Sequence, residues 1–229
     1  MLPRTLEPES MDDPAEAASY DDMNHSAVNI RFVDDLLAGG SIGNDILDLG
    51  TGTAQIPILL CERMPDIRIM ALDAAASMLE LAIYNIEIAS AIERIQLMQG
   101  DAKAMDDFED EMFDCVMCNS LIHHLPEPQP TFAEIHRLTA IDGRIFVRDL
   151  CRPDSADAVE ALVAQYAGKE SEVAQQLFRQ SLHAALTLDE VKQMVSAAGM
   201  SPDAVQMTSD RHWTLDVRKS AACQEGTAS

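Results

Sequence analysis

Three aspartates stand where short apolar runs of the sequence end, and each can present a carboxylate to a ligand. Asp48 is followed at once by Gly50 and Gly52. Asp73 closes a second run, and Asp101 follows a third. Carboxylates accept hydrogen bonds from hydroxyl and amino groups, and glycines let a ligand approach backbone amides that a Cβ would shield. The pattern therefore indicates a site where carboxylates and backbone amides hold a polar ligand.

The elements that carry these residues follow from the hydrophobic pattern. Residues 45–49 suit a buried strand, and a helix follows the glycines, with Pro57 in its first turn, where a missing N–H costs nothing. The stretch before the next strand, at 67–73, is long enough for a helix, so we expect parallel pairing. In open parallel sheets, ligands bind at the edge where the strands end.

The rest of the chain continues this alternation of strands and helices. The predicted strands are 45–49, 67–73, 94–99, 114–118, 143–150, 203–208 and 212–218, and predicted helices include 26–38, 75–90 and a segment around 132–138. Two apolar stripes at helical spacing predict a two-helix insert at 153–186. This insert either caps a ligand pocket, mediates homodimerisation or only fills space. Thr187 and Glu190 form a capping box that opens a further helix.

The glycine loop distinguishes between two classes of ligand. A dinucleotide fingerprint G-x-G-x-x-G that begins at Gly50 requires glycine at position 55, where this chain has Gln55. The motif present is D-x-G-x-G-x-A from Asp48 to Ala54. It resembles the first motif of class I S-adenosylmethionine-dependent methyltransferases, with Ala54 in place of a third glycine, a change expected to affect only close packing. The alternative is an ordinary strand-to-helix turn of another α/β protein.

Later segments resemble the small-molecule branch of that family. His123, His124 and Leu125 follow the fourth strand, and an arginine-leucine segment from Arg137 leads to Gly143 before the fifth. Both features are similar to ubiquinone/menaquinone-biosynthesis methyltransferases, and the resemblance extends over residues 20–218. DNA amino-methylating enzymes carry N/D-P-P-Y/F at the position where this chain reads N-S-L-I.

The resemblance implies the fold and the donor. The fold is an α/β, Rossmann-like, seven-stranded and mostly parallel sheet with helices on both faces, an antiparallel last strand and a helical insert after strand five. The donor is S-adenosyl-L-methionine, with S-adenosyl-L-homocysteine as product. Asp73 is assigned to the ribose hydroxyls, Asp101 and the Ala102 amide to the adenine edge, and Met78 to the purine face or simply to the core. The implied donor-binding residues are Asp48, Gly50, Gly52, Asp73, Ala74, Met78, Asp101, Ala102, Asn119 and Ser120.

The acceptor side is less constrained by the sequence. The candidate catalytic residues are His123 and His124 as bases and Arg148 as a partner for a negatively charged or polarised acceptor. The alternatives are a histidine that only packs beside the pocket and an Arg148 that pairs internally with Asp149, Asp101 or another strand-end acid. No group of His and Cys residues has zinc-site spacing, so no metal is predicted.

Composition limits the partners. With 39 acidic and 16 basic residues the formal charge is −23, which repels nucleic acid. No apolar run approaches the ~20 residues of a membrane span, and we expect a cytoplasmic protein. The five cysteines form no disulfide framework, and the pair at 115 and 118 lies in a strand whose geometry separates the two side chains.

The domain prediction has three parts. Residues 1–18 form a flexible acidic leader, 19–218 the methyltransferase domain with its insert, and 219–229 a flexible tail. The segment Tyr20 to His25 is either a lid over the ligand or plain surface.

The sequence is also compatible with three other functions. A nicotinamide-dependent oxidoreductase would share the sheet, although Gln55 argues against it. A catalytically silent S-adenosylmethionine-binding partner protein would lack an acceptor pocket. Arsenite methylation is suggested by Cys118 and Cys151 at neighbouring strand ends, but no cysteine precedes Cys61.

Overall fold

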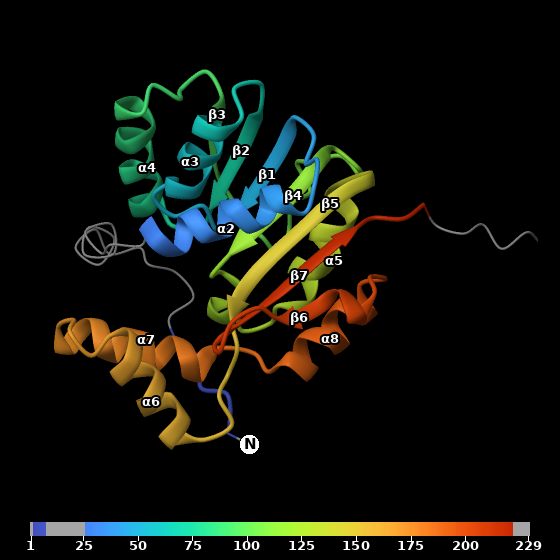
Figure 1. Cartoon of the computed structure of the whole chain (residues 1–229). Coiled ribbons are helices and arrows are strands. Elements are labelled where there is room, and N and C mark those ends of the chain that lie inside the picture. The colour runs from blue at the N-terminus through green and yellow to red at the C-terminus, as the bar shows by residue number, and fades with distance from the viewer. Residues whose placement is uncertain (1, 8–25, 222–229) are drawn as a thin grey trace, which may run out of the picture.

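The computed structural model of the chain describes residues 2–7 and 26–221 and contains one seven-stranded sheet (Figure 1). The strands are β1 Asp45–Leu49, β2 Arg68–Asp73, β3 Ile95–Gln99, β4 Phe113–Asn119, β5 Thr139–Leu150, β6 Val205–Met207 and β7 His212–Arg218. Their order is β3-β2-β1-β4-β5-β7-β6, with β1 to β5 parallel and β7 antiparallel to both of its neighbours. The predicted fold class is confirmed, including its antiparallel last strand.

Helices cover both faces of this sheet because its central strands are apolar on both sides. The helices are α2 Ser26–Ala38, α3 Gln55–Arg63, α4 Ala76–Ile88, α5 Gln129–Leu138, α6 Ala156–Tyr166, α7 Glu172–Ala184 and α8 Leu188–Ala197, with short 3₁₀ turns η1 Ile122–His124 and η2 Pro202–Ala204. Ile46 of β1 packs in a cluster with residues of α2, α3 and α4, whereas the next residue, Leu47, packs with residues of α5 and α8. Successive strand residues thus serve opposite layers.

The same alternation separates the two cysteines of β4. Cys115 lies in the cluster beside α2 and α3, and Cys118 lies in the opposite cluster. Burial raises the pKa of Cys115 to about 12, so its thiol is inert at neutral pH. The prediction that these residues make a poor redox pair is confirmed.

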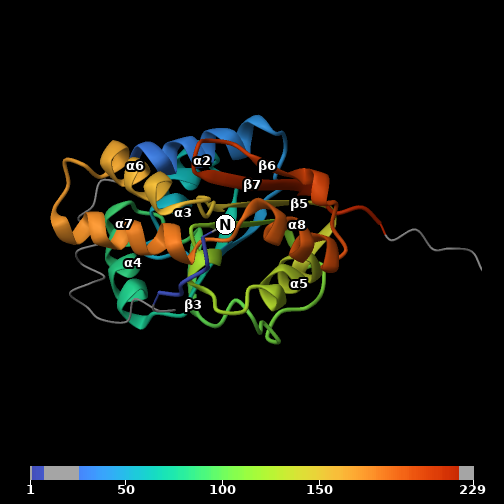
Figure 2. The same cartoon turned by 90° about the horizontal axis from the view of Figure 1, so that it is seen from below.

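The predicted two-helix insert is present as α6 and α7, at the edge where β5 ends (Figures 1 and 2). Val159, Val163 and Leu182 are buried against Leu150 of β5. Tyr166 of α6, by contrast, is 41% exposed. Its ring lies under the guanidinium of Arg211, 3.4 Å from the ring centroid, which provides packing at the surface.

The predicted capping box of α8 is also confirmed. The Thr187 hydroxyl accepts a hydrogen bond from the Glu190 amide, and the Glu190 carboxylate accepts one from the Thr187 amide. These reciprocal bonds satisfy two backbone donors at the helix start and set the chain direction out of the insert.

Residues 2–7, assigned from the sequence to a flexible leader, lie against η1 and α7. The Arg4 guanidinium donates hydrogen bonds to the carbonyls of His123, Leu125 and Ala184, and the Thr5 amide donates to the carbonyl of His183. The rest of the predicted leader, the Tyr20 to His25 segment and the tail beyond residue 221 lie outside the described residues. Among the helices of the described part, none is long and apolar enough to cross a membrane.

Candidate functional site

A cavity of about 410 Å³ opens at the carboxyl edge of the sheet, where β1, β2, β3 and β4 end. Nine of the ten predicted donor-binding residues line it, namely Gly50, Gly52, Asp73, Ala74, Met78, Asp101, Ala102, Asn119 and Ser120. Parallel strands bring their carboxyl ends to one edge, so residues distant in sequence share one cavity.

The glycine loop forms one wall of this cavity in a left-handed backbone conformation. Gly50 and Gly52 have φ angles of 69° and 55°. A Cβ at Gly52 would meet nothing within 4 Å, so its glycine is required by backbone conformation rather than by protein packing. Ala54 is also left-handed, with φ 62°, so the replacement of a third glycine affects backbone strain as well as packing. Ser120, which lines the cavity, has φ 57°, so a strained non-glycine residue lies at the site itself.

Asp73 connects the glycine loop to the start of α4. Its Oδ2 accepts a hydrogen bond of 2.8 Å from the Gly52 amide, and its Oδ1 accepts one of 2.9 Å from the Ala75 amide. Burial raises the pKa of this carboxyl despite those bonds. Each carboxylate oxygen can accept a second hydrogen bond, so Asp73 retains acceptor capacity toward the cavity.

Asp101 and Met78 occupy other parts of the wall. Asp101 is exposed at the rim, and its Oδ1 accepts the Lys103 amide at 2.9 Å and lies 3.4 Å from the Lys103 ammonium. Met78 is 5% exposed and packs against Ala75, so this residue belongs to the core and to the cavity wall together.

Asp48 is the predicted donor-site residue that does not line the cavity. It is 3% exposed and lies behind the glycine loop. Burial raises the pKa of Asp48 to about 7, and the neighbouring charge of Asp73 acts in the same direction.

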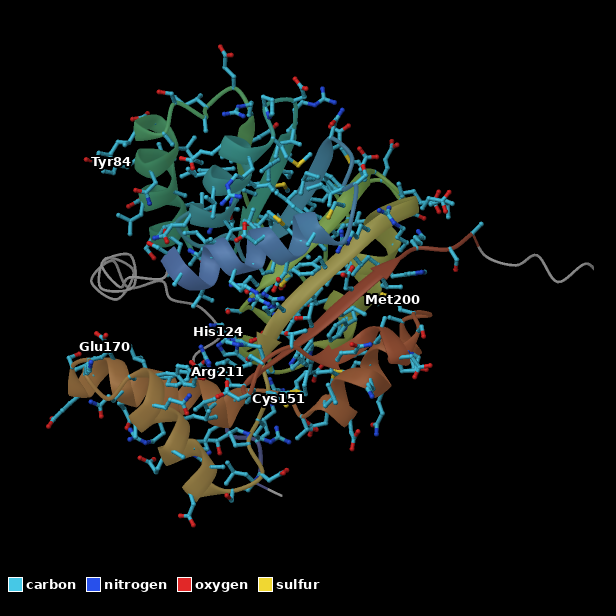
Figure 3. All side chains as sticks on the ribbon, viewed as in Figure 1. Tyr84, His124, Cys151, Glu170, Met200 and Arg211 are labelled. Atoms are coloured by element: carbon cyan, nitrogen blue, oxygen red, sulfur yellow. The ribbon has the colours of Figure 1, made fainter. Side chains whose placement is uncertain are left out.

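The two histidines occupy different environments. His123 is buried, with its Nδ1 2.6 Å from Asp149 Oδ1 and its Nε2 3.2 Å from Glu7 Oε1. Burial alone would lower the pKa of His123, but the two carboxylates outweigh it and raise that pKa to about 10. His124 is half-buried and lines the cavity, at the edge of the sheet that faces the helical insert (Figure 3).

Arg148 lies on the other face of the sheet from these histidines. Its Nη2 is 2.9 Å from Asp35 of α2, its Nε donates to the Thr214 hydroxyl, and its guanidinium lies over Phe146. Asp149 points toward His123, so its strand neighbour Arg148 must point away. The structure therefore does not bring Arg148 together with the histidines. Arg148 instead forms an internal ion pair, as the alternative expected, but its partner is Asp35 of helix α2 and not a strand-end acid.

The comparison with known families decides the identity of the fold. Residues 41–199, more than half of the chain, match the family model described as a methyltransferase domain. The chain belongs to the methyltransferase domain family.

Relatives of this methyltransferase domain include enzymes of quinone biosynthesis. It is 30% identical over 112 residues to demethylmenaquinone methyltransferase of Lactobacillus johnsonii, and the aligned region covers 48% of this chain and 46% of that protein. It is 32% identical over 131 residues to the biotin biosynthesis bifunctional protein BioHC of Teredinibacter turnerae, which covers 53% and 22%. The chain thus spans about half or less of these curated relatives.

Solved structures share the fold of this methyltransferase domain. An O-methyltransferase family protein from Burkholderia thailandensis superposes with a TM-score of 0.69 at 18% identity, over 92% of this chain and 61% of that one. A phosphoethanolamine N-methyltransferase of Haemonchus contortus, solved with S-adenosylhomocysteine, has a TM-score of 0.59 at 17% identity, over 76% and 37%.

The residues of this methyltransferase domain fit an S-adenosylmethionine molecule. The cavity has the size of a small-ligand site, with a carboxylate of remaining acceptor capacity at Asp73. A Cβ at Gly52 would meet no protein atom within 4 Å, so this part of the loop faces open space and its backbone amides can be approached by the amino-acid part of a ligand. Met78 and Ala102 offer apolar surface to a purine on the same wall.

Sequence reasoning missed several residues of this site. Asn29 of α2 donates to the Gln55 side chain at 3.0 Å, and both line the cavity. Asp149 orients His123, and Glu7 reaches the histidines from the N-terminal segment. The position of Asp149 at a strand end was an available signal, whereas nothing in the local sequence around Glu7 indicates a contact so far along the chain.

Replacement of Arg148 tests its placement away from the cavity. We expect Arg148→Met to lower the free energy of unfolding by ~1–2 kcal/mol, because a charged hydrogen bond to a partly exposed Asp35 is lost. The free energy of S-adenosylmethionine binding, measured by calorimetry, should change by much less than the 1.4 kcal/mol that corresponds to a tenfold change. The affinity should therefore stay within a factor of about two. A large loss of donor affinity in a folded variant would contradict this placement.

Proposed function

We propose that this domain transfers the methyl group of S-adenosylmethionine to a small-molecule acceptor by in-line displacement. The supporting observation is the cavity in which the glycine loop, Asp73, Asp101 and His124 come together. Names of relatives support the acceptor class, because several act in quinone biosynthesis. A cytoplasmic location belongs to the same proposal, as do the domain limits 19–218, to which residues 2–7 add their contacts with η1 and α7.

The protein's part in this reaction is mainly geometric. The sulfonium supplies an activated methyl group, so no nucleophilic side chain is needed. In the proposed complex, Asp73 holds the ribose hydroxyls, Asp101 and Ala102 meet the adenine edge, and the glycine loop faces the amino-acid part of the donor. Alignment of donor and acceptor lowers the barrier by fixing the attack geometry.

The acceptor would enter on the side of Asn119, Ser120 and His124. Of the three candidate catalytic residues, His124 lies on the cavity wall, whereas His123 is buried behind it and Arg148 belongs to the opposite face. Arsenite is a poor acceptor for this cavity, since Cys118 is fully buried and burial raises the pKa of its thiol well above the ordinary value.

Transfer from labelled donor tests the proposed function. The chain is incubated with methyl-labelled S-adenosylmethionine and fractionated pools of metabolites, protein and nucleic acid. We expect label in a small-molecule fraction, with S-adenosylhomocysteine formed in equal amount. Label confined to protein or nucleic acid would contradict the acceptor class. Donor binding without transfer to any pool would instead favour a catalytically silent partner protein.

A further inference from the structure

Glu7, His123 and His124 form a cluster at the wall of the cavity, and the proposed methyl transfer gives it no role beyond the place of His124 on the acceptor side. Glu7 Oε1 lies 3.2 Å from His123 Nε2 and 3.2 Å from His124 Nδ1. Within the described part of the chain, these three side chains place one possible ligand atom each within 4.8 Å of the others. Two imidazole nitrogens and one carboxylate oxygen are a frequent ligand set of zinc sites that keep a fourth position open.

The spacing of these atoms suits a tetrahedral cation. Zinc binds imidazole nitrogen at ~2.0–2.1 Å and carboxylate oxygen at ~2.0–2.2 Å, so two ligand atoms of a tetrahedral site lie roughly 3.3 Å apart. The two separations from Glu7 Oε1 match that edge. The His123 and His124 rings are tilted by 33° to each other, with centroids 4.2 Å apart, and each ring places one nitrogen 3.2 Å from Glu7 Oε1.

The hydrogen bonds of the cluster leave one buried oxygen of the Glu7 carboxylate without a well-aligned donor. Glu7 Oε1 is buried and lies at ion-pair distance from two imidazole nitrogens, but neither nitrogen makes a well-aligned hydrogen bond to it. Such an atom is costly to bury unless a donor or a cation meets it. His123 presents Nε2 to this point because its Nδ1 is held by Asp149 at 2.6 Å. A carboxylate behind a histidine is the arrangement that orients metal-binding imidazoles.

The N-terminal segment holds Glu7 in place before any cation binds. The Arg4 guanidinium is bonded to three carbonyls of η1 and its surroundings and to the Ala184 carbonyl of α7. The Ser181 hydroxyl donates to the other Glu7 oxygen, Oε2. The Glu7 side chain is only 7% exposed as a result, so Oε1 is fixed toward the histidines. Preorganised ligands lose little entropy on binding.

The charges at the cluster favour a cation. Glu7 and Asp149 bring two carboxylates to His123, and both are buried. A divalent cation bound beside them would balance both carboxylates. Imidazole nitrogen favours zinc over magnesium or calcium, which prefer ligand sets made of oxygen.

We infer that Glu7, His123 and His124 bind one zinc ion at the wall of the donor cavity. The cation would adjoin the cavity because His124 lines it, and its fourth position would be open to a ligand oxygen. One consequence rests on the proposed methyl transfer: a hydroxyl acceptor bound there would release its proton to solvent and present an oxyanion to the donor methyl group. His124 would then hold the metal rather than act as the base itself.

Titration with zinc alone tests the site in the full chain. The protein is freed of metal with a chelator and titrated with Zn²⁺ by calorimetry, and Co²⁺ absorption reports the coordination geometry. We expect one Zn²⁺ per chain and a visible Co²⁺ spectrum of tetrahedral type. Glu7→Gln and His124→Ala should each weaken Zn²⁺ binding at least ~10- to 100-fold, the range seen even for residues that only support ligands.

Two control variants separate this site from unspecific binding. Glu170→Gln changes an exposed glutamate in the bend before α7 (Figure 3). His136→Ala changes a histidine of α5 outside the cluster. Both should retain zinc affinity. Thermal unfolding of each metal-free variant is measured alongside zinc binding, so that loss of a ligand in a folded Glu7→Gln chain is separated from loss of fold.

Two outcomes would overturn the zinc site. One is the absence of stoichiometric Zn²⁺ binding, which would identify the cluster as a protonated histidine between carboxylates. The other is equal zinc affinity in the Glu7→Gln, His124→Ala and control variants. Donor affinity, measured separately with S-adenosylmethionine, should be the same in Glu7→Gln, Glu170→Gln and His136→Ala, whose replaced side chains do not line the cavity. Failure of the zinc site and failure of the proposed methyl transfer are therefore distinguishable.

Discussion

Replacement of Asp73 by alanine is expected to weaken S-adenosylmethionine binding by ~2–4 kcal/mol, which is about 30- to 1,000-fold in Kd. The carboxylate lines the cavity and can accept two ribose hydroxyls in addition to its present bonds. The change also leaves the Gly52 amide without its partner, so the glycine loop loses an anchor on the donor side. Calorimetry with purified variant and donor measures the effect.

Two comparisons show which part of this loss comes from the ribose. Asp106→Ala removes an exposed aspartate and should leave the Kd unchanged. A donor analogue that lacks one ribose hydroxyl should lose less affinity than the natural donor when Asp73 is replaced, because one of the bonds is already missing. Equal losses for both ligands would assign Asp73 to loop anchoring alone. An unchanged Kd in a folded variant would remove it from the donor site.

Replacement of Asp48 by asparagine is expected to change how stability depends on pH. Between acid and alkaline pH, the free energy of unfolding of the variant should gain about 4 kcal/mol relative to that of the natural chain. Burial raises the pKa of Asp48 from its ordinary value of 3.8 to about 7. The difference of about 3 pKa units corresponds to about 4 kcal/mol at 1.36 kcal/mol per unit. Asparagine keeps a polar group of similar size and carries no charge. The free energy of unfolding of the variant therefore lacks the pH-dependent loss that Asp48 causes.

The direction of the pH dependence follows from proton binding. The folded state holds the Asp48 proton more tightly than the unfolded state, so the free energy of unfolding of the natural chain falls as pH rises from about 4 to about 7 and then levels. Urea unfolding at pH 4, 6 and 8 should therefore show a growing advantage of Asp48→Asn. The exposed Asp66→Asn is the matched control and should show a constant difference. Parallel pH profiles for Asp48→Asn and the natural chain would contradict the raised pKa.

The donor side of the site was largely predictable from the sequence. Strand ends and the glycine loop are local patterns, and parallel strands connected by helices must bring their carboxyl ends to one edge. This rule placed Gly50, Asp73 and Asp101 together without knowledge of any contact, and the cavity contains all three. The predicted bounds of α2, from 26 to 38, and the capping box at Thr187 also agree with the structure, because helix starts and ends depend on nearby residues.

The tertiary structure alone decided which side chains meet at the acceptor side. Arg148 and Asp149 are neighbours in sequence but face opposite layers of the sheet, and only the pairing of β5 with its neighbours determines which faces which layer. Ala54 provides a second example, since its left-handed backbone conformation is set by the folded glycine loop and is not indicated by its residue type. Glu7 reaches the histidines through the bonds that Arg4 makes with η1 and α7, far along the chain. Local patterns report a residue's own element, whereas contacts of this kind depend on how distant elements pack.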